Sequence, residues 1–326
     1  MKATAKAPAN IAFIKYWGRK NEALRLPLNS SISMNLSNAY TVTTVDFSPS
    51  YIRDEIEFKN KVVSEKDKNR IIEHLDRIRK LAKIRLFAKV VTENNFPQKT
   101  GIASSASGFA ALTKAVCTSL DLNLTQKELS ILARLASGSA CRSIPDGFVE
   151  WRQGDKSEES FACSLYDENY WDLRDIVLVL KEEEKKIPSS DGHRNVKTSP
   201  LLKKRLNNLP KRIERLKKAL KEKDFYTFGK IIEEEALEMH SVMKTQTPPL
   251  FYLNRSTIEI IEKIKAWRKR GLFSYFTLDA GPNIHLVCEG KDEKEVLERV
   301  KGKEEIKQII VNKPSQGASI ISKHLF

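Results

Sequence analysis

Apolar positions in the first half of the chain recur at two spacings, which predict both strands and helices. Residues 8–16 and 31–47 alternate or cluster their apolar side chains, as strands do. Residues 66–82 place apolar side chains at helical spacing instead. Thr125 followed by Glu128 is the pattern of a capping box and predicts the start of another helix. The same criteria predict further strands at 84–92, 147–151, 159–166 and 176–180, a helix at about 105–120, and an end near 135 for the capped helix.

The second half of the chain begins with helices and ends in an α-β-β-α-β unit. Helical spacing dominates residues 199–244. Pro210 is predicted to begin a new helix there, because proline is tolerated in a first turn. The unit that follows consists of a helix at 256–269, strands at 273–278 and 283–288, a helix at 293–301 and a strand at 306–311. Runs of strands mixed with long helices indicate an α+β fold.

The length of 326 residues predicts two lobes, because one compact core rarely holds so long a chain. A charged run at 181–186 and a turn-rich segment at 188–192 interrupt the periodic pattern. We therefore expect an N-terminal lobe over residues 1–182 and a C-terminal lobe with a helical insertion over residues 183–326.

The composition is that of a globular protein, with 40% hydrophobic and 30% charged residues. No apolar run approaches the roughly 20 residues that a membrane span needs. The N-terminus lacks the apolar core of a signal peptide. We expect a cytoplasmic protein with no membrane partner. Its four cysteines are then expected as reduced thiols, although disulfide pairing stays open, and the lack of a Cys-x-x-Cys pair argues against zinc.

The net charge of +15 has two interpretations. Such a charge attracts an anionic partner, either a polyphosphate substrate or a nucleic acid. Alternatively, many of the lysines only line solvated helix faces. The basic runs 203–205 and 217–221 lie in helical sequence with acids nearby, which favours the second interpretation.

The first candidate for chemistry is the segment 97–106, Pro-Gln-Lys-Thr-Gly-Ile-Ala-Ser-Ser-Ala, between a predicted strand and a predicted helix. Gly101 lets the backbone approach a ligand closely. The N-terminus of the following helix offers free N–H groups and a partial positive charge, which suit a phosphate. The Gly-Lys-Ser/Thr ending of a Walker A loop is absent. A serine-rich helix cap explains the local pattern equally well.

Five segments together resemble a known family. Residues 97–106 are similar to the Pro-x-x-x-Gly-Leu-x-Ser-Ser-Ala pattern of the GHMP kinase superfamily, with Ile102 in the leucine place. Four more segments, in the order and spacing of diphosphomevalonate decarboxylases, are PANIAFIKYWG at 8–18, LPLNSSIS at 26–33, SGSACRS at 137–143 and DAGPN at 279–283. The resemblance covers nearly the whole chain. It implies a two-lobed GHMP kinase fold, with a mixed sheet in the N-terminal lobe and a ferredoxin-like α/β C-terminal lobe.

The resemblance also implies a reaction. Diphosphomevalonate decarboxylases convert (R)-5-diphosphomevalonate and ATP into isopentenyl diphosphate, ADP, phosphate and CO2, in the mevalonate pathway of isoprenoid biosynthesis. The implied cofactors are ATP and Mg2+, the ion bridging charge on the triphosphate. The implied partners are the small-molecule substrate and a second copy of the chain in a homodimer, with no nucleic acid.

Three residues are implied to act at the reacting atoms. Asp279 alone would be interpreted as a turn residue before Gly281, but the resemblance places its carboxylate near the substrate 3-hydroxyl. Lys15, a lone lysine in an apolar stretch, either reaches solvent or pairs with a buried anion, and the resemblance places it beside Asp279. The guanidinium of Arg142 fits a carboxylate in two-point contact. The resemblance assigns it to the C1 carboxylate rather than to a surface ion pair.

The other implied site residues bind the two ligands. The substrate-binding residues are Tyr16, Lys20, Ser137, Ser139, Arg142, Ser189, Ser190 and His193. The ATP-binding residues are Pro97, Gly101, Ile102, Ala103, Ser104, Ser105, Ala106 and Ser107. Tyr16 and Lys20 are expected at the diphosphate and Ser105 at the ATP phosphates, with Ser104 assisting the metal.

Departures from the family pattern keep alternatives open. Many relatives have methionine where His193 stands, and Pro145-Asp146 replaces an aromatic–glycine pair. These differences leave the diphosphate contacts open, so a phosphomevalonate decarboxylase is one alternative. A mevalonate 3-kinase is a second, although it would need no Lys15, Arg142 and Asp279 set. A basic RNA-binding protein is a distant third, since no RNA-recognition aromatic motif is present.

Overall fold

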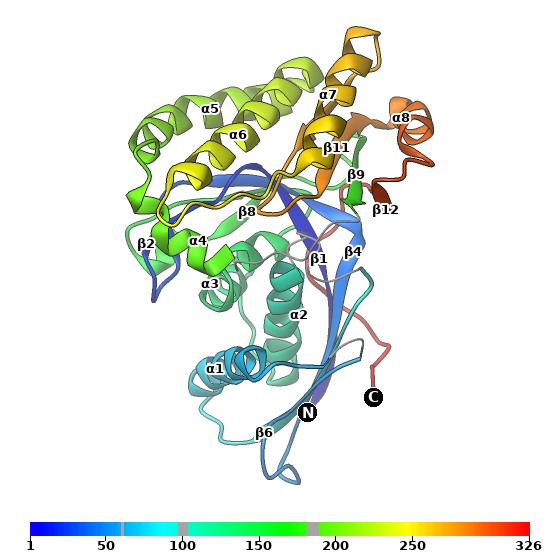
Figure 1. Cartoon of the computed structure of the whole chain (residues 1–326). Helices are drawn as coiled ribbons and strands as arrows, with labels where there is room; N and C mark the ends of the chain where they lie inside the picture. Colours follow the sequence, from blue (N-terminus) through cyan, green and yellow to red (C-terminus); the bar gives the residue numbers. More distant parts are fainter. Residues whose placement is uncertain (60–61, 97–103, 181–188) are drawn as a thin grey trace.

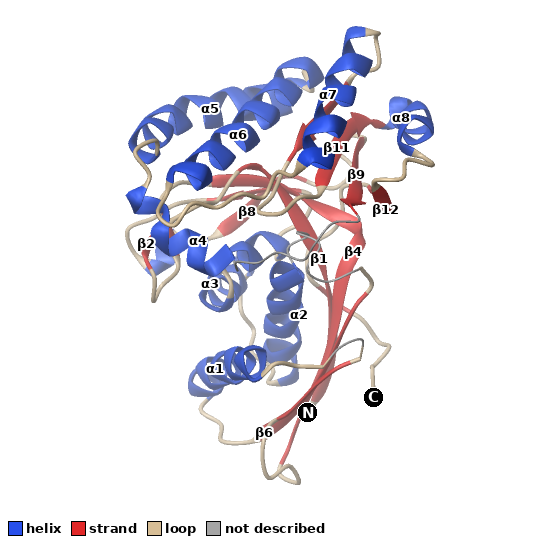
Figure 2. Ribbon diagram, viewed as in Figure 1, coloured by secondary structure: helices blue, strands red, loops and turns tan. Residues whose placement is uncertain are grey.

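The protein is built on two β-sheets with helices packed against each (Figure 1; Figure 2). A computed structural model describes residues 1–59, 62–96, 104–180 and 189–326, except for the side chains of 189–191. None of the helices in these ranges has both the length and the apolar composition needed to cross a bilayer.

The first sheet contains seven strands of the described residues, in the order β13-β1-β4-β6-β5, with β7 on β4 and β8 on β7. Only β5 and β6 run parallel. Strand β4 pairs with β6 through 41–48 and with β7 through 31–34, so it links two parts of the sheet. The strands are β1 (Lys2–Ile14), β4 (Ser31–Ser48), β5 (Glu55–Phe58), β6 (Phe87–Asn94), β7 (Phe148–Trp151), β8 (Ala162–Tyr166) and β13 (Ser319–Ile320).

Three helices cover this sheet. Helix α2 (Ser104–Ser119) packs on β1 and β4, and α1 (Glu65–Ala82) and α3 (Gln126–Ala136) pack against α2. Helix α3 begins with the predicted capping box, since Thr125 Oγ1 and the Glu128 carboxylate each accept the other's backbone N–H. A 3₁₀ helix, η1 (Gly138–Ser143), follows α3 and leads to β7.

The second sheet has the order β10-β11-β9-β12 and is antiparallel throughout. Its strands are β9 (Leu173–Leu180), β10 (Ser274–Thr277), β11 (Ile284–Glu289) and β12 (Ile306–Asn312). The associated helices are α5 (Leu202–Glu222), α6 (Phe225–Thr245), α7 (Arg255–Lys269) and α8 (Glu293–Val300). Strand β9 belongs to this sheet, although the predicted N-terminal lobe extends to residue 182 and includes it. The lobe boundary itself stays a prediction.

The two sheets share one apolar core, in which α6 lies between β1 and β10. The rings of Phe13 on β1 and Phe228 on α6 meet edge to face, with centroids 4.9 Å apart. Smaller elements complete the boundary between the sheets: a hairpin of β2 (Arg19–Asn21) and β3 (Leu26–Pro27), and the short helix α4 (Ser189–Asn195).

Two expectations about element ends were wrong. Pro210 does not begin a helix but lies inside α5, which runs unbroken from Leu202 to Glu222. Leu209 and Leu216, on either side of the proline, are both buried, so packing outweighs the hydrogen bond that proline cannot make. Strand β1 begins at Lys2, earlier than predicted, because buried alanines at 3, 5 and 7 carry little apolar signal in the sequence.

The last strand along the chain returns to the first. Strand β13 pairs with β1 through Ala5–Ile320 and Lys6–Ser319. Beyond it, Lys2 Nζ donates to the carbonyl oxygen of Phe326 at 2.9 Å. The first sheet therefore contains the first and the last described strands, and both ends of the chain lie at its edge (Figure 1).

Candidate active site

An ion pair joins strand ends from the two sheets. Lys15 Nζ donates to Asp279 Oδ1 at 2.8 Å. Lys15 is the first residue after β1, and Asp279 is the second after β10. The Lys15 side chain is 2% exposed and that of Asp279 24%. The lysine is thus enclosed, while the carboxylate keeps one side open to a ligand.

Burial opposes charge on both groups, and their contact favours it. Desolvation by burial raises the pKa of Asp279, but Lys15, His285 and Arg142 together hold that pKa below the ordinary 3.8. Desolvation prevails at Lys15 and lowers its pKa below the ordinary 10.5, against the attraction of Asp279 and Glu235. The lowered pKa of Asp279 thus depends on the positive charge of Lys15, 2.8 Å away.

Arg142 lies beside this pair and is held by polar side chains. It is 4% exposed, on η1. Its Nε donates to Asn10 Oδ1 at 3.1 Å and its Nη1 to Ser31 Oγ at 3.0 Å. Burial lowers the pKa of Arg142, while the charge of Asp279 raises it. These two neutral acceptors fix the guanidinium without neutralising it, so its charge remains available for an anionic ligand.

Tyr16, the residue after Lys15, forms a second polar group with Arg19. Arg19 Nε donates to Tyr16 Oη at 2.6 Å. The Tyr16 ring lies against Gly138, where an added Cβ would stand 2.8 Å from the Tyr16 Oη and Cε1 atoms. Glycine at the start of η1 therefore lets the phenol approach the Ser137–Arg142 segment closely.

Lys20, predicted at the diphosphate, contacts an exposed acid in the structure. Its Nζ is 2.5 Å from Oδ1 of Asp155, whose side chain is 91% exposed. Arg19, its neighbour in β2, is the buried basic residue, with 8% exposure. Of the two basic residues, the described geometry brings Arg19 and not Lys20 to Tyr16.

The His193 ring packs against the aromatic rings of Tyr16 and Trp17. Its ring centroid is 4.3 Å from that of Tyr16 and 4.5 Å from that of Trp17. The Gly18 N–H donates to His193 Nδ1 at 2.9 Å, so this nitrogen carries a lone pair and Nε2 is the site left for a proton. The side chains of Ser189 and Ser190 lie outside the described residues.

Ser137, the residue before η1, connects the two ligand regions expected from the sequence. Ser137 Oγ donates to Ser105 Oγ at 3.2 Å, which joins the end of α3 to the start of α2. The Ser139 carbonyl accepts from Asn10 Nδ2 at 3.2 Å, and the residue is partly exposed. The Ser137–Ser105 contact therefore brings a candidate substrate-binding residue next to a candidate phosphate-binding residue.

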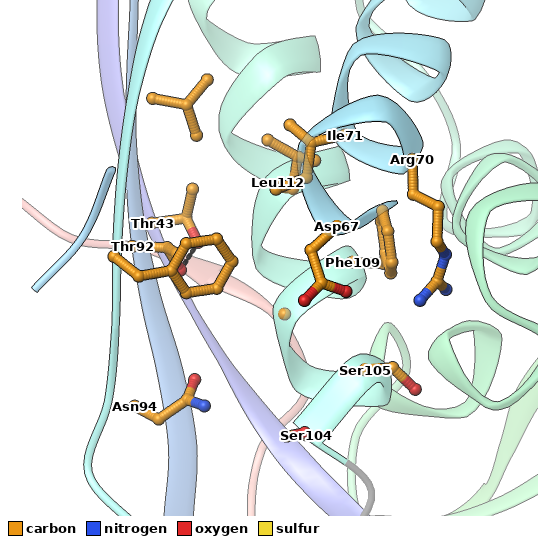
Figure 3. Close-up of a pocket in the computed structure, with 13 residues that line it drawn as sticks. Thr43, Asp67, Arg70, Ile71, Thr92, Asn94, Ser104, Ser105, Phe109 and Leu112 are labelled. Atoms are coloured by element: carbon orange, nitrogen blue, oxygen red, sulfur yellow. Dashed lines mark hydrogen bonds between the residues drawn. The ribbon is translucent and has the colours of Figure 1, made fainter. Parts of the chain in front are cut away.

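A cavity of about 200 Å³ opens beside the start of α2 (Figure 3). Ser104 and Ser105 lie at one end, and Asp67 and Arg70 reach it from α1. The remaining lining residues are Thr43, Phe58, Ile71, Val90, Thr92, Asn94, Gly108, Phe109 and Leu112. The walls thus combine apolar side chains with polar groups, and two of the polar groups are the serines at the helix N-terminus.

The expected phosphate-binding residues divide into three groups. Ser104 and Ser105 line the cavity. Ala106 and Ser107 are fully buried, and Ser107 Oγ bonds Thr41 Oγ1 at 2.7 Å, so these two support the start of the helix from inside. Pro97, Gly101, Ile102 and Ala103 lie outside the described residues.

Three arginines make this region electropositive. Burial, with the charges of Arg19 and Arg70, lowers the pKa of Arg25 to about 10. Arg25 Nε donates to the Leu135 carbonyl at 2.9 Å, near the end of α3. Glu22, 2.7 Å from Nη1 of Arg19, offsets part of this positive charge, and an anionic ligand would relieve the repulsion that remains.

Sequence reasoning missed Asn10, Arg19, Arg25 and Arg70. Asn10 had a signal, because an asparagine inside a buried apolar strand needs partners for its amide. Arg25 and Arg70 had none, since nothing along the chain distinguishes them from the many other basic residues.

Comparison with known proteins places these residues in context. Residues 7–162 match the model of the diphosphomevalonate decarboxylase-like N-terminal domain. Residues 175–322 match the model of the mevalonate 5-diphosphate decarboxylase C-terminal domain. A diphosphomevalonate decarboxylase from Candida albicans is 37% identical over 313 residues, 90% of this chain and 86% of the relative.

Solved structures resemble the whole fold. Mevalonate diphosphate decarboxylase from Staphylococcus aureus superposes with a TM-score of 0.94 at 37% identity, over 98% of both chains. The protein called MDDEF, in complex with MVAPP, AMPPCP and magnesium, gives a TM-score of 0.92 at 36% identity over 99% of both chains. The expected α+β fold of the GHMP kinase type is thereby confirmed.

Proposed function

Because this chain belongs to the diphosphomevalonate decarboxylase family, we propose that it converts 5-diphosphomevalonate and ATP into isopentenyl diphosphate, ADP, phosphate and CO2. The observation that carries the proposal is the ion pair of the buried Lys15 and the partly exposed Asp279, with Arg142 beside it. A carboxylate, an ammonium group and a guanidinium at one point match the needs of a substrate that carries a hydroxyl and a carboxylate.

In the first step the substrate 3-hydroxyl attacks the γ-phosphorus of ATP, and ADP leaves. Asp279 is the group that orients this hydroxyl and accepts its proton. Its lowered pKa keeps the carboxylate ionised, so it is ready as an acceptor at neutral pH. Lys15 holds the carboxylate in place and balances its charge.

In the second step the C3–O bond to phosphate and the C1–C2 bond both break. The electron pair of the C1–C2 bond becomes the C2–C3 double bond, and CO2 and phosphate leave. Arg142 grips the C1 carboxylate and sets its orientation. Positive charge that develops at C3 is stabilised by the Asp279 carboxylate.

The diphosphate of the substrate and the triphosphate of ATP bind at two of the polar regions described above. Tyr16, Arg19, Ser139 and His193 surround the substrate diphosphate; Lys20, 2.5 Å from an exposed acid, takes a peripheral part at most. The ATP nucleoside enters the cavity between α1 and α2, and its phosphates meet Ser104 and Ser105 (Figure 3). Mg2+, bound together with ATP, would neutralise charge on the triphosphate, next to Ser104 and Ser105.

The decisive assay offers ATP and Mg2+ with mevalonate, its 5-phosphate or its 5-diphosphate, and measures ADP and CO2 separately. We expect equal amounts of ADP and CO2 with the 5-diphosphate alone. The same products with the 5-phosphate alone would make the protein a phosphomevalonate decarboxylase. ADP without CO2 would make it a 3-kinase, and the role given to Lys15 would be wrong.

A homodimer, which the family resemblance implies, and a cytoplasmic location, which was expected from the sequence, complete the proposal. Light scattering on the purified chain should give twice the 37.2 kDa of one copy. A single-copy mass would refute the dimer. Fractionation of cells should recover the protein with the cytosol.

A further inference from the structure

Both members of the central ion pair lie just beyond the regular strands. Lys15 follows the last residue of β1. Asp279 lies in the segment 278–283, between the end of β10 and the start of β11. Strand pairing ends before both residues, so other contacts must set where their backbones stand.

The backbone of Lys15 is fixed by a buried carboxylate on α6. Its N–H donates to Glu235 Oε1 at 3.0 Å, and Glu235 is fully buried. Arg205 Nη2 contacts the same carboxylate at 2.5 Å and also donates to the Lys15 carbonyl at 3.3 Å. Arg212 Nη1 donates to the other oxygen of this carboxylate, Glu235 Oε2, at 2.6 Å. The side-chain amide of Asn29 donates a further hydrogen bond to the Lys15 carbonyl at 3.0 Å.

The backbone of Asp279 is fixed by a histidine on the same helix. His240 Nε2 is 3.1 Å from the Asp279 carbonyl oxygen. A carbonyl only accepts, so Nε2 carries the proton and donates it. Burial and the charge of Lys15 lower the pKa of His240 to about 4, so the ring is neutral at physiological pH. The one other backbone bond to this oxygen comes from the Gly281 N–H, within the same loop, at 2.8 Å.

The other nitrogen of His240 makes no compensating hydrogen bond within the described part of the chain. Nδ1 is buried and has no hydrogen-bond partner among the described residues. A buried polar atom without a partner costs free energy, which an apolar side chain at this place would avoid. The polar contact that the ring does make to the backbone goes to the residue that faces the substrate.

We propose that α6 positions the reacting pair, with Glu235 holding the backbone of Lys15 and His240 holding the backbone of Asp279. The inference rests on the proposed function and adds two positioning residues to it. The two anchors are five residues apart, about 7.5 Å along the helix and about 140° around it at ideal geometry. They therefore lie on the two flanks of the buried face of α6. In this way one helix sets the distance between the ammonium group of Lys15 and the carboxylate of Asp279, which are 264 residues apart in sequence.

A displacement of the pair would act on the chemical step more than on binding. Misplacement of a catalytic group by about 1 Å costs on the order of 10²-fold in rate. The phosphate contacts at Ser104, Ser105 and Arg19 lie on other elements, so affinity for the ligands should change little.

The test compares His240→Leu with His240→Gln in the full chain. Leucine removes the donor, whereas the glutamine amide can donate from nearly the same place as Nε2. With ATP, Mg2+ and 5-diphosphomevalonate, we expect kcat to fall about 10²-fold in His240→Leu, with KM for both substrates within about threefold. His240→Gln should keep at least about a third of kcat. The alkaline limb of kcat should also move to lower pH in His240→Leu, as Lys15 loses part of the field of Asp279 while Glu235 and Arg142 stay in place.

His74→Leu is the matched control. His74 is equally buried and bonds Thr113 Oγ1 through Nε2 at 2.8 Å, but on α1, away from the ion pair. We expect it to lower thermal stability and leave kcat within about threefold. Should His240→Leu fail to melt cooperatively, His240→Asn replaces it, because its shorter amide cannot reach the Asp279 carbonyl.

The outcomes separate the inference from the proposed function. An active parent with an unchanged kcat in His240→Leu would overturn the inference alone. So would a folded His240→Gln as slow as the leucine variant, or an equal loss in His74→Leu. No turnover by the parent would overturn the proposed function and the inference with it.

Discussion

Lys15 carries an ammonium group on a side chain that is 2% exposed, which proteins tolerate only where a counter-charge compensates the lost hydration. Asp279 supplies that charge, and its own pKa falls as a result. The two residues thus stabilise each other's ionised form, and each is more informative as half of a pair than alone.

The lowered pKa of Lys15 predicts where activity fails at high pH. Loss of the ammonium proton should reduce kcat with an apparent pKa below the ordinary 10.5. The ordinary pKa of arginine lies about two units above that of lysine. Lys15→Arg should therefore be slower than the parent at pH 7, and its alkaline decline should move to higher pH. A pH profile of kcat for both proteins checks this, and an unchanged alkaline limb in the variant would assign the limb to another group.

Asp279→Asn removes the proton acceptor and keeps the side chain's size. We expect kcat to fall 10²–10⁴-fold, the usual contribution of a positioned acid–base group. Binding of ATP, followed by fluorescence titration, should change by less than about threefold, because the cavity beside α2 does not include this residue. Retention of kcat in a folded variant would remove Asp279 from the chemistry.

The sequence predicted a site residue where its side chain differs in polarity from its neighbours. It did not predict the choice between two similar side chains, because that choice depends on the folded geometry. A lysine within an apolar stretch was conspicuous, and the structure pairs it with Asp279. Arg19 and Lys20 are both basic and adjacent, and neighbours in a strand face opposite sides. The register that buries one and exposes the other comes from the fold and is not visible in the sequence.

Helix α5 shows packing overriding a local signal. Its proline at position 210 is exposed, while Leu209 and Leu216 hold the helix on the core. Most of the other predicted elements were found within a few residues of their expected ends, because their apolar spacing is regular. The start of β1 was missed for the opposite reason, since small buried alanines give little contrast with their polar neighbours.

Pro210→Ala should stabilise the protein. The change restores an N–H in the interior of α5 and removes the clash of the ring with the preceding turn. Greater freedom of the unfolded chain offsets part of this gain, so we expect about 1–2 kcal/mol more free energy of unfolding. Urea unfolding at pH 7 checks it. Lys211→Ala, next along the exposed face, is the control and should change stability by less than about 0.5 kcal/mol.

The whole molecule should lose stability in mild acid. Burial lowers the pKa of His74 to about 3 and that of His240 to about 4, against an ordinary 6.5. Between these values the unfolded chain binds more protons than the folded one, so stability is present above pH 6.5 and is lost as pH falls toward 4. Each histidine contributes a slope of about 1.4 kcal/mol per pH unit at most.

Unfolding titrations at pH 7.0, 5.5 and 4.5 measure this slope. His74→Gln should remove the part due to one histidine and flatten the curve by up to about 1.4 kcal/mol per pH unit. Identical slopes in parent and variant would mean that His74 does not stay neutral in the folded protein.

The pairing of β13 with β1 has a consequence for how the protein is made. On the ribosome, β1 emerges before the other described strands, and β13, which pairs with its edge at Ala5 and Lys6, is translated only after the described strands of the second sheet. A nascent chain therefore holds its first sheet with one edge uncovered for most of synthesis. Uncovered edges invite pairing with other chains, and lysines on them discourage it. We expect Lys2 and Lys6, at the start of β1, to disfavour pairing of that edge with other chains until β13 has been synthesised.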